Sequence, residues 1–301
     1  MTIRIIYCIP SVVLYALVLI ALYKEVKGSK GHFNHLLMTQ AVLNIAVFLN
    51  SFYAVQLANV TEVKDWWSVL YTRAPVIVTS ICECLVFHFA YVQTYMTFFI
   101  SLFRTTIIAL PTKHKTIWSY AFPTSVVITL VTPFFSTYQF LIFRNWFEND
   151  YDFKYFILRT EAGLYVVMTQ LLVFMCLLLV LMCSVNAISV VFLFLRPLNN
   201  QNRAERNMFI LALLDFFIEA GFVALYVIIY TNSAGSPAAQ SLIPYASDIL
   251  TFSNAYLLLL LNKRIRKRVL ELLRCSRCAI IFCPQKTSST FSQIYYETSA
   301  E

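Results

Sequence analysis

Residues 162–195 read AGLYVVMTQLLVFMCLLLVLMCSVNAISVVFLFL and contain no charged side chain. A bilayer core about 30 Å thick is crossed by roughly 20 residues of helix. The stretch is longer than that, which predicts a helix that tilts or extends beyond the headgroups. Helix is the expected form because lipid offers no partner to unpaired backbone groups, and the apolar residues do not alternate as barrel strands would.

Six more stretches of the chain are long and apolar enough to cross a bilayer. The predicted spans are about 3–23, 36–57, 75–103, 120–143, 162–195, 207–230 and 242–261. They make up a predicted transmembrane domain over residues 1–261, followed by a cytoplasmic amphipathic helix and polar tail over 262–301. Pro133 lies inside the fourth span and predicts a kink there. The first apolar run is long and lacks a small-residue cleavage site, so we expect a retained helix rather than a signal peptide.

The overall composition agrees with a membrane protein and excludes most soluble classes. Of the 301 residues, 59% are apolar and 13% charged, and the mean hydropathy is +0.70. A soluble domain is nearer half apolar and a quarter charged. The net charge of +8 would suggest nucleic acid in a soluble protein, but here we expect no nucleic-acid partner. Eight scattered cysteines do not form a disulfide framework.

Basic residues are distributed unequally between the two sides of the predicted bundle. With the N-terminus outside, the inner loops and tail hold 17 Lys and Arg and the outer side holds 6, which accounts for all 23. Cytoplasmic segments carry such an excess, so we expect the C-terminus inside. Asn59-Val60-Thr61 is the only glycosylation sequon and falls in the first outer loop, although sequons also occur by chance. An all-α bundle of seven such spans is the architecture of a serpentine, GPCR-like receptor.

Four acidic residues fall inside predicted spans, and each would be costly if it faced lipid. They are Glu83, Asp215, Glu219 and Asp248. We therefore expect all four to face the bundle interior. Glu83 and Asp248 lie roughly 12 Å and 10 Å from the outer ends of their helices, a depth that suits a ligand cavity open to the outside.

Three further residues are candidates for ligand binding. His88 lies deeper on the third span, but it is about 140° around the helix from Glu83, so the two do not share a face. Tyr226 and Tyr245 lie near the outer ends of the sixth and seventh spans. Aromatic belts place tyrosines at membrane interfaces regardless of any ligand, and this second interpretation stays open.

Asp215 and Glu219 are i, i+4 neighbours nearer the cytoplasmic side, where like charges repel. We expect one of them to be protonated or paired with a basic group such as Arg104 or Arg206. Such a pair could hold an inactive state. The alternative is that both are simply inward-facing polar residues.

The tail predicts an amphipathic helix from Lys263 to Arg274 that lies along an anionic inner leaflet. Its apolar positions are Ile265, Val269, Leu272 and Leu273. Cys275, Cys278 and Cys283 follow directly, in a spacing that lacks a fourth zinc ligand. We interpret Cys275 and Cys278 as palmitoylation sites, with free thiols as the alternative.

Several local sequences carry a family resemblance. They are YCIPSVVLY at 7–15, HF at 32–33, AVLN at 41–44, FLNSF at 48–52 and SLFRTT at 101–106, followed by Leu110-Pro111 and a basic loop that ends at Trp118. Together they resemble the nematode serpentine chemoreceptors, most closely the class gamma (srg) branch. The resemblance covers nearly the whole chain. It implies a G-protein-coupled receptor in the plasma membrane of sensory neurons that serves chemotaxis by detecting small environmental molecules.

The sequence departs from related receptors at several points. Phe103 stands where relatives of this family usually have Asn before the arginine, and the Asp-Arg-Tyr and Asn-Pro-x-x-Tyr signatures of rhodopsin-like receptors are absent. The second outer loop has no cysteine, so the usual bridge to the third span cannot form. Arg104 lies roughly 44 Å along its helix from Pro75, which predicts a hydrated guanidinium at the inner headgroups. The resemblance implies that Arg104 contacts the G protein, and the alternative is a snorkelling arginine.

The expected partners of such a receptor are a small-molecule ligand, a heterotrimeric G protein and membrane lipids. Three other functions are alternatives to it. The chain has four histidines and no catalytic motif, so we expect no enzyme, cofactor or metal site. A transporter or channel is the stronger alternative because intramembrane acids are typical of proton-coupled carriers. Carriers, however, usually show repeated halves with Gly-interrupted spans. A structural or trafficking membrane protein is the remaining alternative.

Overall fold

The computed structural model describes residues 2–28, 32–62, 64–149, 156–195, 202–231 and 237–280. Within these ranges the side chains of 2–5, 202–208, 237–241 and 274–280 are not described.

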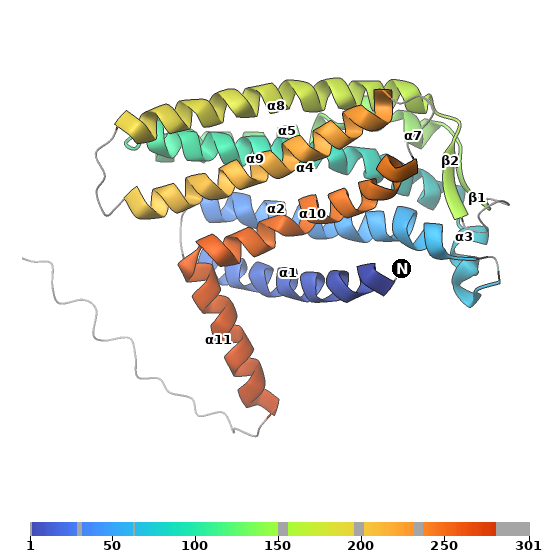
Figure 1. Cartoon of the computed structure of the whole chain (residues 1–301), viewed down its shortest axis with the longest axis horizontal. Coiled ribbons are helices and arrows are strands. Elements are labelled where there is room, and N and C mark those ends of the chain that lie inside the picture. Colours follow the sequence, from blue (N-terminus) through green and yellow to red (C-terminus); the bar gives the residue numbers. More distant parts are fainter. Residues whose placement is uncertain are drawn as a thin grey trace, which may run out of the picture.

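A bundle of long, roughly aligned helices forms most of the molecule (Figure 1). Its main helices are α1 (Thr2–Gly28), α2 (His32–Ser51), α4 (Val76–Ala109), α5 (His114–Val131), α8 (Leu164–Leu195), α9 (Asn202–Thr231) and α10 (Pro237–Leu261). Each takes the place of one of the seven apolar stretches recognised in the sequence. The start of α1 and the last helix, α11 (Lys263–Ile280), lie at opposite ends of the bundle (Figure 1).

Six helical segments in the described part of the chain are long and apolar enough to cross a membrane. They are Ile6–Lys27, His32–Val60, Val76–Ala109, His114–Thr137, Leu164–Leu195 and Phe209–Thr231. Helix α10 has 25 residues and would supply the seventh crossing. The chain is therefore a multi-pass, helical membrane protein.

Two irregular segments interrupt this regular pattern. Helix α2 continues as a π-helical segment, η1 (Phe52–Leu57), and a 3-10 turn, η2 (Ala58–Val60). The fourth span breaks where the sequence predicted a kink, because α5 ends at Val131 and two short helices, α6 (Phe134–Thr137) and α7 (Gln139–Ile142), follow Pro133. That prediction is confirmed.

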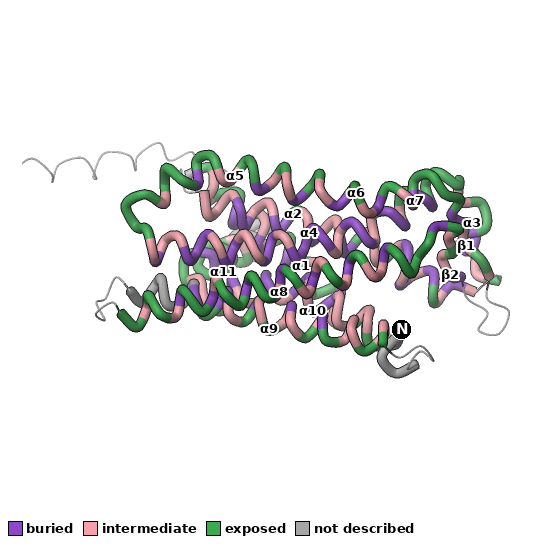
Figure 2. Tube along the Cα trace, turned by 90° about the horizontal axis from the view of Figure 1, so that it is seen from above, coloured by how far each residue is buried: buried purple, intermediate pink, exposed green. Residues whose placement is uncertain are grey.

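Helix α4 lies at the centre of the bundle. Half of its most apolar stretch is buried, against about a fifth to two fifths for the other five candidate spans. One core cluster joins α4 to α1, α2, α10 and α11, and a second joins it to α8 and α9. Figure 2 shows buried residues along α4 and exposed ones along much of α5. Because lipid is as apolar as these side chains, close packing and interhelical hydrogen bonds hold such a bundle together.

A two-stranded hairpin covers one end of the bundle and adds a β element to the all-α fold expected from the sequence. Strand β1 (Asn145–Asn149) pairs antiparallel with β2 (Phe156–Thr160). Two short helices, η3 (Trp66–Ser68) and α3 (Val69–Thr72), lie at the same end (Figure 1). Aromatic rings join these parts, because Tyr71 stacks on Tyr53 and Phe156 and meets Phe147 edge-on. Burial raises the pKa of the Tyr71 hydroxyl above its usual value.

Asn145 anchors the base of this hairpin. Its side chain is fully buried, and its Nδ2 lies 2.9 Å from the Ser80 hydroxyl on α4, 2.6 Å from the Phe140 carbonyl and 2.9 Å from the Phe143 carbonyl. This amide ties the segment between α7 and α8 to α4.

Replacing Asn145 by Ala should lower the free energy of unfolding by about 1–3 kcal/mol, because buried acceptors lose their donor. The hairpin should also become more susceptible to limited proteolysis. Thermal unfolding and protease digestion of the purified protein measure both effects. Glu148→Ala on the same strand is the matched control, since Glu148 is exposed and its Arg159 partner is half exposed. Equal effects of the two substitutions would contradict the anchoring role.

Helix α11 leaves the bundle and packs beside the end of α1. Ile265 and Val269 are buried in the main core cluster, whereas Leu273 is 45% exposed. The Arg268 Nε donates a hydrogen bond of 3.2 Å to Glu25 on α1. The expected apolar stripe is present, but Ile265, Val269 and Leu272 pack against protein and do not face lipid. The side chains of Cys275 and Cys278, and the whole of Cys283, lie outside the described residues, so palmitoylation stays a prediction.

Candidate functional site

All four intramembrane acids are buried, as their cost in lipid predicted. The exposed fractions are 7% for Glu83, 9% for Asp215, 0% for Glu219 and 4% for Asp248. Glu83 and Asp248 lie nearer the hairpin, and Asp215 and Glu219 lie further along the bundle, in the middle of α9. We call them the outer and the inner group, after the orientation expected from the sequence.

Asp248 holds three segments together in the outer group. The Tyr7 hydroxyl on α1 donates to its Oδ2 at 2.6 Å, and the Gln56 amide in η1 donates to its Oδ1 at 2.8 Å. Asp248 itself lies on α10. These partners could not be inferred from the sequence, because Tyr7 and Asp248 are 241 positions apart. Tyr245, nearly one turn earlier on α10, is 38% exposed and lines a cavity together with Gln56.

Glu83 lies on another side of the bundle and receives no hydrogen bond from the described residues. Tyr226 on α9 is close enough to interact with it electrostatically. His88 faces elsewhere, with its ring 4.3 Å from that of Phe134 on α6. The expectation that Glu83 and His88 do not share a face is therefore confirmed. The ligand roles of Glu83, His88, Asp248, Tyr226 and Tyr245 stay predictions.

A central hydrogen-bond network joins four helices between the outer and inner groups. The Asn44 amide on α2 donates to the Tyr15 hydroxyl on α1 at 2.9 Å and to the Thr251 carbonyl on α10 at 3.2 Å. The Gln93 amide on α4 donates to the Asn44 Oδ1 at 3.3 Å and to the Thr251 hydroxyl at 3.2 Å. These residues were not among the site residues predicted from the sequence. The four acids were predicted because they are polar residues in apolar stretches of sequence. The same criterion also applies to Asn44 and Gln93.

The inner group contains a buried cation without a hydrogen-bond partner. Arg104 is only 3% exposed, and its Nε, Nη1 and Nη2 find no hydrogen-bond partner among the described residues. Its guanidinium carbon lies 5.6 Å from the centre of the Phe33 ring. The prediction of a hydrated guanidinium is wrong. The prediction rested on the distance of Arg104 from Pro75 along α4. That distance does not reveal that side chains from neighbouring helices surround the guanidinium.

The two acids of the inner group lie on α9 and face α4. Asp215 interacts electrostatically with Arg104, although their charged atoms are more than 4.0 Å apart and form no closed salt bridge. Glu219 accepts a hydrogen bond of 2.7 Å from the Thr94 hydroxyl through Oε1, while its Oε2 has no partner among the described residues. The side chain of Arg206 lies outside the described residues. Its pairing with these acids, and its part in G-protein coupling, stay predictions.

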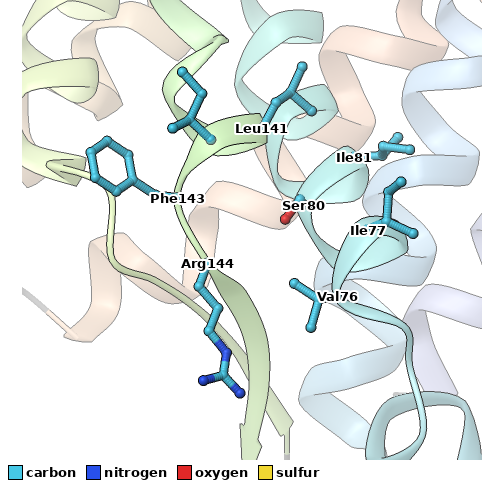
Figure 3. A pocket seen from close by; sticks show the side chains of 8 residues that line it. Val76, Ile77, Ser80, Ile81, Leu141, Phe143 and Arg144 are labelled. Carbon is cyan, nitrogen blue, oxygen red and sulfur yellow. The ribbon is translucent and has the colours of Figure 1, made fainter.

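In the described part of the chain, cavities open on the side of the bundle, and two of them bear on ligand binding. One of about 690 Å³ lies between the start of α4 and the end of α7. Figure 3 shows Ile77 and Ile81 of α4 on one wall, Leu141 and Phe143 across from them, and the Arg144 side chain extending away from Leu141. The other, of about 460 Å³, lies between α1, the end of α2 and α10. Neither cavity is lined by Glu83 or by Asp248.

The candidate glycosylation site is exposed at the hairpin end of the bundle. Asn59 lies in η2 with an exposed side chain, while Thr61 is buried and donates to the Leu57 carbonyl. If this end is extracellular, glycosidase treatment of protein from a eukaryotic membrane should shift its electrophoretic mobility. Asn59→Gln should abolish that shift. A chain that is unmodified in both forms would leave the orientation without this support, and a shift that persists in Asn59→Gln would contradict the assignment.

The structure is that of a multi-pass membrane protein whose long apolar helices turn their acidic residues inward. Comparison with known families identifies its class. Residues 1–269 match the model of the Srg family chemoreceptors, so the chain belongs to this family. It is similar to serpentine receptor class gamma-31 of Caenorhabditis elegans, with 24% identity over 284 residues that cover 89% of this chain and 90% of the relative. The class gamma resemblance and the absence of enzyme activity are both confirmed, because this is a family of receptors.

Proposed function

We propose that this chain is a G-protein-coupled chemosensory receptor in the plasma membrane, with its N-terminus outside and its C-terminus inside. It binds a small environmental ligand in the outer half of the bundle and signals to a heterotrimeric G protein at the inner end. Sensory neurons are the proposed cell type, as the family resemblance implies.

The observation that carries this proposal is the placement of two polar groups in opposite halves of one bundle. The outer group is centred on Asp248 and the inner group on Arg104. Asn44 and Gln93 lie between them, and the next residue after Gln93, Thr94, bonds to Glu219. A ligand can shift a conformational equilibrium only if it interacts differently with the two states. Helices shared by both polar groups supply such a coupling.

Arg104 has no hydrogen-bond partner among the described residues, which supports a specific change at the inner end. Burying an unpaired charge is expensive. A rearrangement that opens the inner end would hydrate the guanidinium or offer it to a partner, which lowers that cost. In the proposed mechanism, a ligand changes the contacts of α1, α2 and α10 at Asp248, and Arg104 becomes exposed to the G protein. Asp215, on the facing side of α9, holds the closed state.

A nucleotide-exchange assay tests the receptor function directly. Purified full-length protein in lipid nanodiscs should accelerate GTPγS binding by a heterotrimeric G protein over empty nanodiscs. The same preparation in liposomes should show no ion or solute flux. Flux without nucleotide exchange would overturn the proposal and favour a transporter or channel.

A further inference from the structure

The smaller of the two lateral cavities differs from an ordinary gap between membrane helices. Its volume of about 460 Å³ is within the range of small-molecule pockets, roughly 300–1,000 Å³. Its walls come from α1, from the outer part of α2 with η1, and from Tyr245 on α10. We call it the α1–α2 groove. Its most exposed wall residues are Ile9, Val13, Leu49 and Phe52.

The π-helical segment forms one edge of this groove. Phe52, Gln56 and Leu57 belong to η1 and also line the cavity. A π-helical segment is wider than an α-helix, and such segments are rare and frequent at functional sites. In this chain the segment brings the Gln56 amide to Asp248 while leaving Phe52 at the open side of the groove.

The lining chemistry defines the class of ligand. None of the described residues that line the groove is charged, and Gln56 and Tyr245 provide its amide and phenol groups. A charged ligand would lose its hydration here without gaining a counter-ion. A mostly hydrocarbon molecule with one hydrogen-bonding group matches these walls.

The exposure of the wall residues indicates the side from which a ligand reaches the groove. Ile9 is 61% exposed, Val13 56% and Leu49 59%, and all three lie on helices long and apolar enough to cross the membrane. Exposed apolar side chains on such helices face lipid. The groove therefore opens sideways into the bilayer, where neutral apolar molecules concentrate.

We propose that the α1–α2 groove binds a neutral, mostly hydrocarbon small molecule that enters from the bilayer, with its single polar group beside Gln56 and Tyr245. The effect of binding on signalling rests on the proposed receptor function. Because Gln56 bonds to Asp248, a bound molecule would alter the contact between α1, α2 and α10. The binding itself requires no G protein.

Photolabelling of the full chain in nanodiscs tests the proposal. The probe is a medium-chain alcohol that carries an aliphatic diazirine, and the labelled residues are found by mass spectrometry. Labels should gather on 8–13 and 48–60, and an excess of the unmodified alcohol should remove them. Val13→Trp should weaken the competable labelling about tenfold, equivalent to ~1.4 kcal/mol, by filling the groove. Leu49→Trp provides a second filled variant.

A matched control variant and several possible results can contradict the proposed binding. Val127→Trp on α5 adds the same bulk at a 59% exposed position outside the groove and should leave labelling unchanged. Labels spread evenly over all exposed helices, with no competition, would overturn the proposal. So would equal competition by a short-chain phosphatidylcholine in detergent, because the groove would then hold bilayer lipid. Failure of nucleotide exchange refutes the receptor function and leaves this result intact.

Discussion

The free energy of unfolding should rise by about 1–4 kcal/mol when Arg104 is replaced by Met, while G-protein nucleotide exchange should fall about tenfold or more. Arg104 is buried, and all three of its guanidinium nitrogens lack hydrogen-bond partners in the described part of the chain. Methionine fills a similar volume without the charge. The two opposite changes follow from the proposal that the cation destabilises the closed bundle and is retained for its contact with the G protein.

Thermal unfolding in detergent and GTPγS binding in nanodiscs measure the two effects on the same preparation. Arg73→Met is the matched control, because Arg73 is exposed between α3 and α4 and should change neither quantity. An Arg104→Met protein that is less stable and still active would show that the guanidinium has a structural role only. The attraction between Asp215 and Arg104 would then be the first explanation to test.

A loss of stability on the order of 3 kcal/mol is expected for Asp248→Ala, from roughly 1–3 kcal/mol for each hydrogen bond to this buried carboxylate that is lost. The two donors that lose this acceptor are the Tyr7 hydroxyl and the Gln56 amide. Because they come from α1 and η1, their release should also loosen the outer half of the bundle. Asp248→Asn keeps one oxygen acceptor and should give an intermediate loss.

Fluorescence-detected size-exclusion chromatography after a series of heating steps measures this loss without a known ligand. Glu62→Ala is the control: Glu62 makes a short salt bridge of 2.7 Å with Lys64, but the two side chains are 44% and 79% exposed. An exposed pair of this kind contributes about 0–1 kcal/mol. If Asp248→Ala were as mild as Glu62→Ala, the three-segment junction would not be an important contact.

The sequence was most informative where a single physical cost dominates. A charge in lipid is so unfavourable that the burial of Asp248, Glu83 and Glu219 could be predicted from their position in apolar runs. The length of those runs placed the helices, and Pro133 placed the break after α5. These inferences need only the local sequence and the thickness of a bilayer.

The hydrogen-bond partners of these residues depend on how distant segments of the chain pack together. No local sequence pattern predicts that packing. The Gln56–Asp248 bond joins positions 192 apart in the chain. The burial of Arg104 arises from helices that surround the end of α4. The hairpin at Asn145–Thr160 is held by its contacts with α4 and with the aromatic cluster around Tyr71, and its strands have only five residues each. Local propensity is weak over such short lengths.

The amide anchor at Asn145 has a consequence for how the hairpin end of the bundle responds to redox conditions. Cys82, Cys84, Cys176 and Cys183, in the described part of the chain, are free thiols. One buried asparagine holds the hairpin to Ser80 on α4 and to the end of α7, and these hydrogen bonds need no oxidase or isomerase to form. The hairpin end of the receptor should therefore keep its shape in millimolar reductant, because no sulfur–sulfur bond among the described residues fastens the hairpin to α4.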